Sequence, residues 1–238
     1  MTHTNYSVRE RLHDEAQRVT VPPVIAQRRG RGFLVAAGIA FALFLALLTL
    51  VRRNPRLDAD VVATMRLQRI RHPLLLRLMG FVSWFGFRPQ SLLLPGTAVG
   101  GLWALGLRRD ARFLGSAWAA SLLSWTTKRF VQRPRPGGDG IAVADADLRD
   151  SSFPSGHALH YVVFWGFFAY LCCARIRQRG ARWFSTGAIG AVIGLVGPSR
   201  IYLGHHWLTD VLGSYSLGSG YLATLIGLHR RGLKDERR

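Results

Sequence analysis

The chain has 238 residues, of which 49% are hydrophobic, and its 32 Lys and Arg residues against 13 Asp and Glu give a formal net charge of +19. Such a charge is typical of proteins that bind nucleic acid or a membrane surface. The arginines cluster beside long apolar runs rather than along one face of a soluble domain, which argues against nucleic acid as a partner and favours a membrane protein.

The N-terminal region predicts a polar tail and a first membrane span. Residues 1–32 are expected to form a cytoplasmic tail, and the apolar run FLVAAGIAFALFLALLTLV at 33–51 has the length that a helix needs to cross a bilayer. A secretory signal would have a shorter apolar core and a small-residue cleavage site. The run is therefore interpreted as a retained span.

Residues 52–87 allow two topologies. The whole chain predicts six spans. That count places the segment 52–71 outside the cell, although it contains six arginines. If HPLLLRLMGFVSWFGF at 72–87 also crossed the membrane, the segment would be cytoplasmic and the N-terminus external. Because 72–87 is short and contains Arg77, we favour an amphipathic helix at the membrane interface.

Five more apolar segments follow, rich in the small residues that let membrane helices pack closely. Together with 33–51 they predict an all-α polytopic membrane helical bundle of six transmembrane helices plus the interfacial helix. The membrane domain covers 33–228, and 229–238 form a basic cytoplasmic tail. The five segments lie at 91–107, 113–127, 158–174, 183–197 and 207–228.

The crossings separate the connections into two groups. The arginine-rich segments 108–112 and 175–182 share one side with the C-terminus, and the positive-inside rule makes that side the cytoplasm. The connections 128–157 and 198–206 then share the extracytoplasmic face. Each of them contains clustered polar residues.

The first polar cluster is KRFVQRPRP at 128–136. Lys128 and Lys234 are the two lysines of the chain, so a lysine here is informative. Its ammonium can act as a point charge for a phosphate, whereas Arg133 or Arg135 offers a planar fork for paired oxygens. Taken alone, the cluster also fits a basic anchor beside a span.

The second cluster, SSFPSGH at 151–157, leads into a predicted span. Ser155 can cap the helix, Gly156 lets the backbone approach a ligand, and a helix N-terminus attracts anions. His157 lies in the first turn and can exchange protons near neutral pH. Taken alone, the cluster is also consistent with a capped helix start.

The third cluster is SRIYLGHHWLTD at 199–210. His206 and Asp210 are four residues apart and share a helix face, so Asp210 can accept a hydrogen bond from the ring and leave its other nitrogen basic. His205 points elsewhere. An aspartate inside a span is costly and usually functional, although a polar interfacial turn is the alternative.

Together the three clusters suit phosphate-ester hydrolysis by an enzyme-bound histidine, and at this point the sequence resembles the type 2 phosphatidic acid phosphatase and vanadium haloperoxidase superfamily. The signature of that family is lysine, six residues, Arg-Pro; then Pro-Ser-Gly-His; then Ser-Arg, five residues, histidine, three residues, aspartate. Every fixed position is matched within 128–210, by Lys128, Arg135, Pro136, residues 154–157, Ser199, Arg200, His206 and Asp210.

The resemblance implies a role for each residue. His206 attacks phosphorus to form a phosphohistidine, Asp210 orients it, and His157 protonates the leaving oxygen. No metal or other cofactor is implied, Arg133 has no assigned role, and four loop acids, Asp139, Asp145, Asp147 and Asp150, are expected to be solvated. The implied phosphate-binding residues are Lys128, Arg135, Ser155, Gly156 and Arg200.

The implied function is that of a multi-pass cell-membrane phosphatase with its active site on the extracytoplasmic face. Its partners are the bilayer and a lipid phosphate monoester or diphosphate, with phosphatidate, phosphatidylglycerol phosphate and undecaprenyl diphosphate as candidates. Two alternatives stay open: a non-catalytic membrane protein that binds lipid phosphates, and a haloperoxidase that holds vanadate in the same anion cradle. The oligomeric state is left open.

Overall fold

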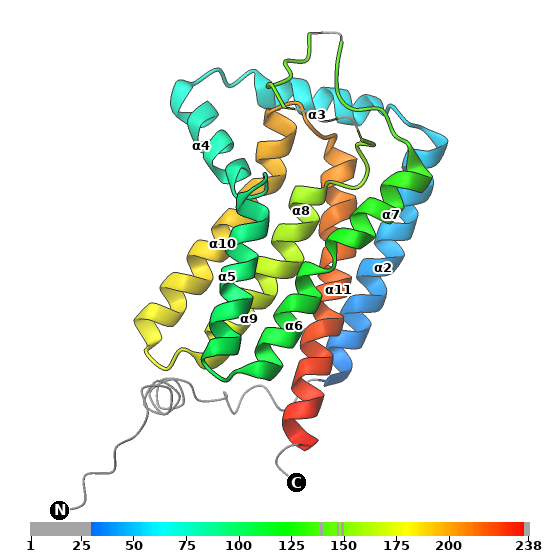
Figure 1. The fold of residues 1–238 in the computed structure, drawn as a ribbon. Helices are drawn as coiled ribbons and strands as arrows, with labels where there is room; N and C mark the ends of the chain where they lie inside the picture. The colour runs from blue at the N-terminus through cyan, green and yellow to red at the C-terminus, as the bar shows by residue number, and fades with distance from the viewer. Residues whose placement is uncertain (1–29, 139, 147, 149, 236–238) are drawn as a thin grey trace, which may run out of the picture.

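The computed structural model describes residues 30–138, 140–146, 148 and 150–235. The elements it describes are helices, which confirms the all-α class (Figure 1). Residues 1–29 of the expected N-terminal tail and 236–238 of the C-terminal tail lie outside the described residues. In chain order the elements are α2 (Gly30–Arg53), α3 (Asp58–Gln68), α4 (Pro73–Trp84), α5 (Gln90–Ala104), α6 (Arg108–Trp118), α7 (Ser121–Val131), α8 (Gly156–His160), the π-helical η2 (Tyr161–Trp165), α9 (Gly166–Arg175), α10 (Arg179–Tyr202) and α11 (Leu208–Asp235).

Helix length supports four of the six expected spans. In the described part of the chain, the helical stretches long and apolar enough to cross a membrane are Gly32–Arg53, Gly156–Arg175, Arg179–Tyr202 and Leu208–Arg231. The expected span at 91–107 corresponds to α5, which has 15 residues. The one at 113–127 is divided between α6 and α7, of 11 residues each.

The helix that lies across one end of the bundle is α3, whereas α4 leads down from that end beside α10 toward α5 (Figure 1). The expected interfacial helix at 72–87 corresponds to α4, which packs against α10. Val82 of α4 is buried in a small core with Ala158 and Val196. This packing holds α4 against the bundle.

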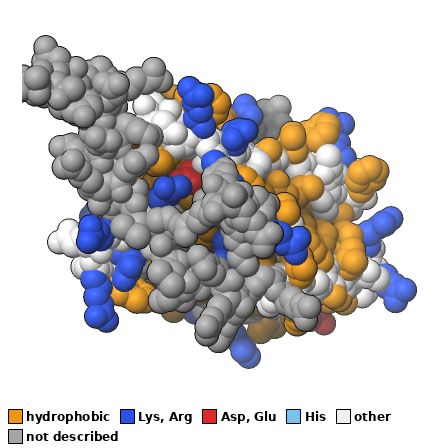
Figure 2. All heavy atoms as spheres, turned by 90° about the horizontal axis from the view of Figure 1, so that it is seen from below, with side chains coloured by type: hydrophobic (Ala, Val, Ile, Leu, Met, Phe, Trp, Pro, Cys, Tyr) orange, Lys and Arg blue, Asp and Glu red, His pale blue; other side chains and the backbone are white. Residues whose placement is uncertain are grey.

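The connections lie at two opposite ends of the bundle. The turns between α5 and α6 and between α9 and α10 lie near the start of α2 and the end of α11 (Figure 1). Figure 2 views this end and shows Lys and Arg side chains around it. The other end holds the end of α2, α3, the 203–207 turn and the described residues of the 132–155 connection.

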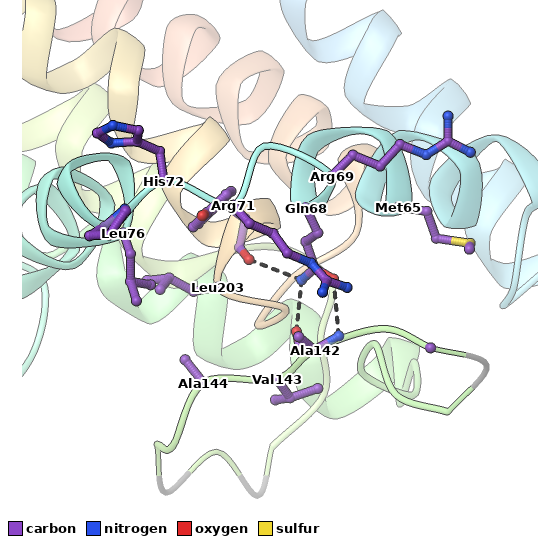
Figure 3. A pocket seen from close by; sticks show the side chains of 13 residues that line it. Met65, Gln68, Arg69, Arg71, His72, Leu76, Ala142, Val143, Ala144 and Leu203 are labelled. Carbon is purple, nitrogen blue, oxygen red and sulfur yellow. Dashed lines mark hydrogen bonds between the residues drawn. The ribbon is translucent and has the colours of Figure 1, made fainter.

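A cavity of about 670 Å³ opens between α3, the start of α4, residues 140–144 and the end of α10 (Figure 3). It contains none of the eight predicted site residues. Beside it, the Gln68 amide bonds the nitrogen and oxygen of Ala142 at 3.0 and 2.7 Å and the Tyr202 oxygen at 2.9 Å. The end of α3 is thereby fastened to the long connection and to α10.

The chain just before the PSGH motif is clamped between two helices. Phe153 is completely buried and stacks on Phe44 of α2, with ring centroids 5.9 Å apart. Gly213 of α11 contacts the same ring, since a Cβ at that position would lie 2.5 Å from Phe153 Cε2. A glycine at 213 therefore allows α11 to approach this segment.

Substituting Gly213→Ala is expected to destabilise the protein by about 1–3 kcal/mol, because the added methyl overpacks a rigid, buried ring. Gly227→Ala on the same helix is the matched control, since its Cβ would meet Phe33 at an ordinary 3.8 Å. Thermal unfolding in detergent measures both. Equal melting temperatures for the two variants would contradict the clamp.

Candidate functional site

A cavity of about 390 Å³ collects most of the predicted site residues. Six of the eight line it, whereas Ser155 and Asp210 lie completely buried behind it. They come from α7, α8, α10 and the two connections between spans, so residues from all three sequence clusters meet. The six are Lys128, Arg135, Gly156, His157, Arg200 and His206.

The PSGH motif begins a helix as the sequence predicts. Ser155 precedes α8, and its hydroxyl oxygen accepts a hydrogen bond from the Ala158 N–H at 3.5 Å, which confirms the predicted cap. A Cβ on Gly156 would lie 3.4 Å from Ser124 Oγ, so a larger residue would crowd the wall of the cavity. The first turn of α8 thereby stays close to the cations of the site.

Arg200 supplies a buried cation to the cavity. Its side chain is 0% exposed, its Nη1 donates to Ser83 Oγ at 2.5 Å, and its guanidinium lies 5.1 Å from the centre of the Phe87 ring. Its Nε and Nη2 have no hydrogen-bond partner among the described residues. Burying such donors is costly unless an acceptor meets them, so the position is suited to an anion.

Lys128 and Arg135 are held together by Asp150. Lys128 Nζ lies 2.6 Å from one carboxylate oxygen, and Arg135 binds the other oxygen and also donates from Nε to the Asp150 carbonyl at 2.9 Å. Burial raises the pKa of Asp150, but hydrogen bonds and charge from Lys128 and Arg135 outweigh it and hold this pKa below its usual value.

Asp150 is exposed, as expected of the loop acids, but it also takes part in the site. Its side chain is 58% exposed, yet it pairs with two cations of the site because both lie within reach of one carboxylate. Asp145 is exposed as expected. Asp139 and Asp147 lie outside the described residues.

His206 presents a basic nitrogen to the cavity. Its Nδ1 lies 2.7 Å from the Ser152 carbonyl, which only accepts, so Nδ1 carries the proton and Nε2 the lone pair. Nε2 faces Arg135 Nη1 at 3.4 Å. Burial first, and then the charge of Arg200, holds the pKa of His206 well below 6.5, so the ring is neutral near pH 7. Such a ring can act as a nucleophile.

The expected hydrogen bond between His206 and Asp210 is not formed, and Ser152 takes its place. The distance from His206 Nδ1 to Asp210 Oδ2 is 3.6 Å. His206 precedes α11, which begins at Leu208, so the two residues do not share a helix face. Instead Asp210 Oδ2 accepts the Trp207 backbone N–H at 2.8 Å, as the third helical residue does in a capping box.

Arg133, for which the sequence assigned no role, lies behind the cavity in a buried cluster. Its Nη1 is 2.5 Å from Asp210 Oδ1 and its Nη2 is 2.6 Å from Asp60 Oδ2, and all three side chains are 0% exposed. Asp60 is not evident from the sequence, because six arginines dominate the segment 52–71. The available signal was a pair of acids, Asp58 and Asp60, in an arginine-rich segment.

The neighbouring histidines differ in surroundings. His157 lines the cavity with its ring 4.6 Å from that of Phe87, and its Nε2 has no hydrogen-bond partner within the described residues. His205 lies outside the cavity lining, and its Nε2 donates to the Ala144 carbonyl at 2.9 Å. Burial, followed by the charge of Arg200, lowers the pKa of His205 to about 4.

Residues 111–231 match the PAP2 superfamily. Phosphatidylglycerophosphatase B of Bacillus subtilis (strain 168) is 30% identical over 182 residues, which cover 75% of this chain and 87% of the relative. The putative undecaprenyl-diphosphatase YbjG of Escherichia coli (strain K12) is 35% identical over 130 residues, which cover 53% and 58%. Both relatives are named for phosphatase activity, which supports assigning this chain to the phosphoric ester hydrolases.

Solved structures show the same architecture. The crystal structure of a transmembrane PAP2-type phosphatidylglycerolphosphate phosphatase from Bacillus subtilis has a TM-score of 0.66 and 25% identity, covering 85% of this chain and 97% of that chain. The crystal structure of Aquifex aeolicus LpxE has a TM-score of 0.56 and 20% identity, covering 74% and 98%, and supports the fold alone. Since the family match encloses all three motifs, the chain belongs to the PAP2 superfamily.

Proposed function

We propose that the chain is an integral membrane phosphatase that hydrolyses a lipid phosphate monoester or diphosphate through a phosphohistidine on His206. The observation that carries this proposal is the unprotonated Nε2 of a neutral histidine, which faces Arg135 in one cavity with three cations. Phosphatidylglycerol phosphate, phosphatidate and undecaprenyl diphosphate are the candidate substrates. The names of the two relatives support the first and the last of these.

The proposed reaction has two steps. His206 Nε2 attacks phosphorus, a P–N bond forms, the P–O bond to the leaving group breaks, and His157 gives a proton to the departing oxygen. Water then attacks phosphorus and gives a proton back to His157, a P–O bond forms, the P–N bond to His206 breaks, and phosphate leaves. Phosphoryl transfer needs mainly positioning and the stabilisation of charge on the equatorial oxygens. Lys128, Arg135 and Arg200 supply that positive charge, so no metal ion is assigned a role.

The remaining site residues complete the phosphate site in this proposal. The Gly156 backbone N–H at the start of α8 is available to a phosphate oxygen. Ser155 lies behind the cavity wall and its oxygen already accepts from Ala158, so in this proposal its hydroxyl hydrogen is the group that serves a phosphate oxygen. Asp210 acts on His206 from 3.6 Å, as a charge behind the ring.

The proposed topology has six crossings and an extracytoplasmic site. We count α4 with α5 as one crossing and α6 with α7 as another, since each pair runs between the two ends of the bundle (Figure 1). The end seen in Figure 2 then faces the cytoplasm, because it carries the short connections rich in arginine. The domain extends over 33–228 between two cytoplasmic tails.

His206→Ala is expected to lower kcat about 1,000-fold or more, because it removes the nucleophile. The control is His205→Gln, whose amide can still donate to Ala144, and it should retain most activity. Phosphate release by detergent-purified protein is measured on the three candidate lipids with a chelator present. A His206→Ala protein that keeps a tenth of wild-type activity would refute the mechanism.

The fall of kcat/KM at low pH, which is the acid limb of its pH profile, is expected below pH 6.5. The pKa of His206 is lowered by burial and by the charge of Arg200, so the reactive neutral form persists as the pH falls through 6.5 and is lost only further down. Rates are measured from about pH 4 to 9, and the ionisation of the substrate is titrated separately. An enzyme-derived limb above 6.5 would contradict a neutral His206 in the free enzyme.

Asp150→Asn is expected to tighten inhibition by vanadate and by phosphate about fivefold, the scale of one partly exposed charge pair. The substitution leaves Lys128 and Arg135 without the carboxylate that a bound phosphate must displace. Asp145→Asn, an exposed acid of the same connection, is the control. Weaker inhibition of Asp150→Asn would show that this carboxylate supports anion binding.

A further inference from the structure

We propose that Arg133 and Asp60 are positioning residues that hold Asp210, and through it the turn bearing His206, in the geometry of attack. The same cluster supplies a net negative charge behind the His206 ring, which stabilises the positive charge that the ring gains on phosphorylation. This inference rests on the proposed function and deepens it. It gives a role to Arg133 and Asp60, which lie outside the family signature.

Arg133 is committed to protein partners. Its Nε donates to the Pro55 carbonyl at 2.8 Å, its Nη1 to Thr209 Oγ1 at 2.7 Å and to Asp210 Oδ1 at 2.5 Å, and its Nη2 to Asp60 Oδ2 at 2.6 Å. The side chain is fully buried and is absent from the cavity lining. Arg133 therefore acts on the substrate through Asp210 and not by contact.

Asp60 carries the same network into α3. One of its oxygens accepts the Thr209 backbone N–H at 2.9 Å, and the other accepts the Thr209 hydroxyl at 2.8 Å. The N–H groups in the first turn of a helix lack partners within that helix. Asp60 thus caps α11 from a distant element. With Gln68 bonded at the other end, α3 braces the turn between α10 and α11.

Asp210 receives the network and contacts both histidine motifs. One oxygen binds Arg133, the other binds the Trp207 N–H and lies 3.6 Å from His206 Nδ1, and the Asp210 carbonyl accepts the Ser155 N–H at 3.4 Å. Rotation of this carboxylate is therefore prevented on both sides. A shift of Arg133 would move Asp210 and, through the Asp210 hydrogen bond, the backbone of Trp207 directly after His206.

Charge adds a second effect to this placement. The carboxylates of Asp60 and Asp210 and the guanidinium of Arg133 give the buried cluster a net charge of −1. Burial strengthens the electrostatic interaction of this charge with the His206 ring. A phosphorylated ring that keeps its Nδ1 proton is positive. The other ionisable groups around His206 are Lys128, Arg135 and Asp150 from the 128–150 region, His157 from α8, Arg200 from α10 and the adjacent His205.

Asp60→Asn tests both effects, because it keeps the shape and changes the cluster charge from −1 to 0. We expect kcat to fall about 10- to 100-fold with KM within about twofold, and the acid limb of kcat/KM to move down by about half a pH unit or more, since neutral His206 becomes favoured. The double variant Asp60→Asn/Arg133→Gln returns the charge to −1. Its acid limb should return to the wild-type position.

Two further variants separate positioning from folding. Asp110→Asn removes a buried carboxylate at the opposite end, where Asp110 pairs with Arg175 at 2.7 Å and His229 at 2.8 Å, so it should lower the melting temperature and leave kcat and the acid limb unchanged. Arg133→Lys keeps the charge but lacks the fork that reaches both carboxylates. It should lower kcat at least about fivefold without moving the limb.

The outcomes distinguish this inference from the proposed function. Full activity of His206→Ala would remove the proposed function and the inference with it. If His206→Ala is inactive while Asp60→Asn and Arg133→Lys keep wild-type kcat and acid limb, the positioning inference alone fails. If Asp60→Asn does not fold, kcat of Arg133→Lys is the test. An unchanged kcat in that variant contradicts the positioning inference.

Discussion

The hydrogen bond between His206 Nδ1 and the Ser152 carbonyl decides which ring nitrogen faces the cavity. A carbonyl only accepts, so the bond fixes the tautomer and leaves Nε2 unprotonated toward the cations. Burial and positive charge keep the ring neutral. One backbone contact thereby converts a histidine into a candidate nucleophile, and the rest of the structure serves to hold that contact.

Three distant segments meet to build it. The Ser152 N–H donates to the Arg133 carbonyl at 2.9 Å, and the Ser152 hydroxyl and the Trp207 indole both donate to the Pro134 carbonyl at 3.0 Å. The segment 128–136 therefore supplies cations to the site, and its backbone carbonyls also hold Ser152 and Trp207 in place. The packing of Phe153 between α2 and α11 fixes the same junction from the membrane side.

The sequence predicted the all-α class, four of the long spans and the six residues that line the cavity, because these depend on apolar length and on side-chain type at fixed spacing. It could not predict the Ser152 contact, since a backbone carbonyl has no residue code. Asp60 is joined to Arg133 across 73 residues, and α3 is too short and polar to stand out. Asp150 gave no signal because exposed acids are common in loops.

Trapping the phosphoenzyme and locating its phosphate tests the assignment of His206 as the nucleophile. Enzyme quenched during turnover on a labelled lipid phosphate is digested and the modified peptide sequenced by mass spectrometry. We expect an acid-labile phosphoramidate on His206, bonded through Nε2, which is the nitrogen that Ser152 leaves unprotonated. Phosphate on His205, or an acid-stable ester on a serine such as Ser155, would contradict it.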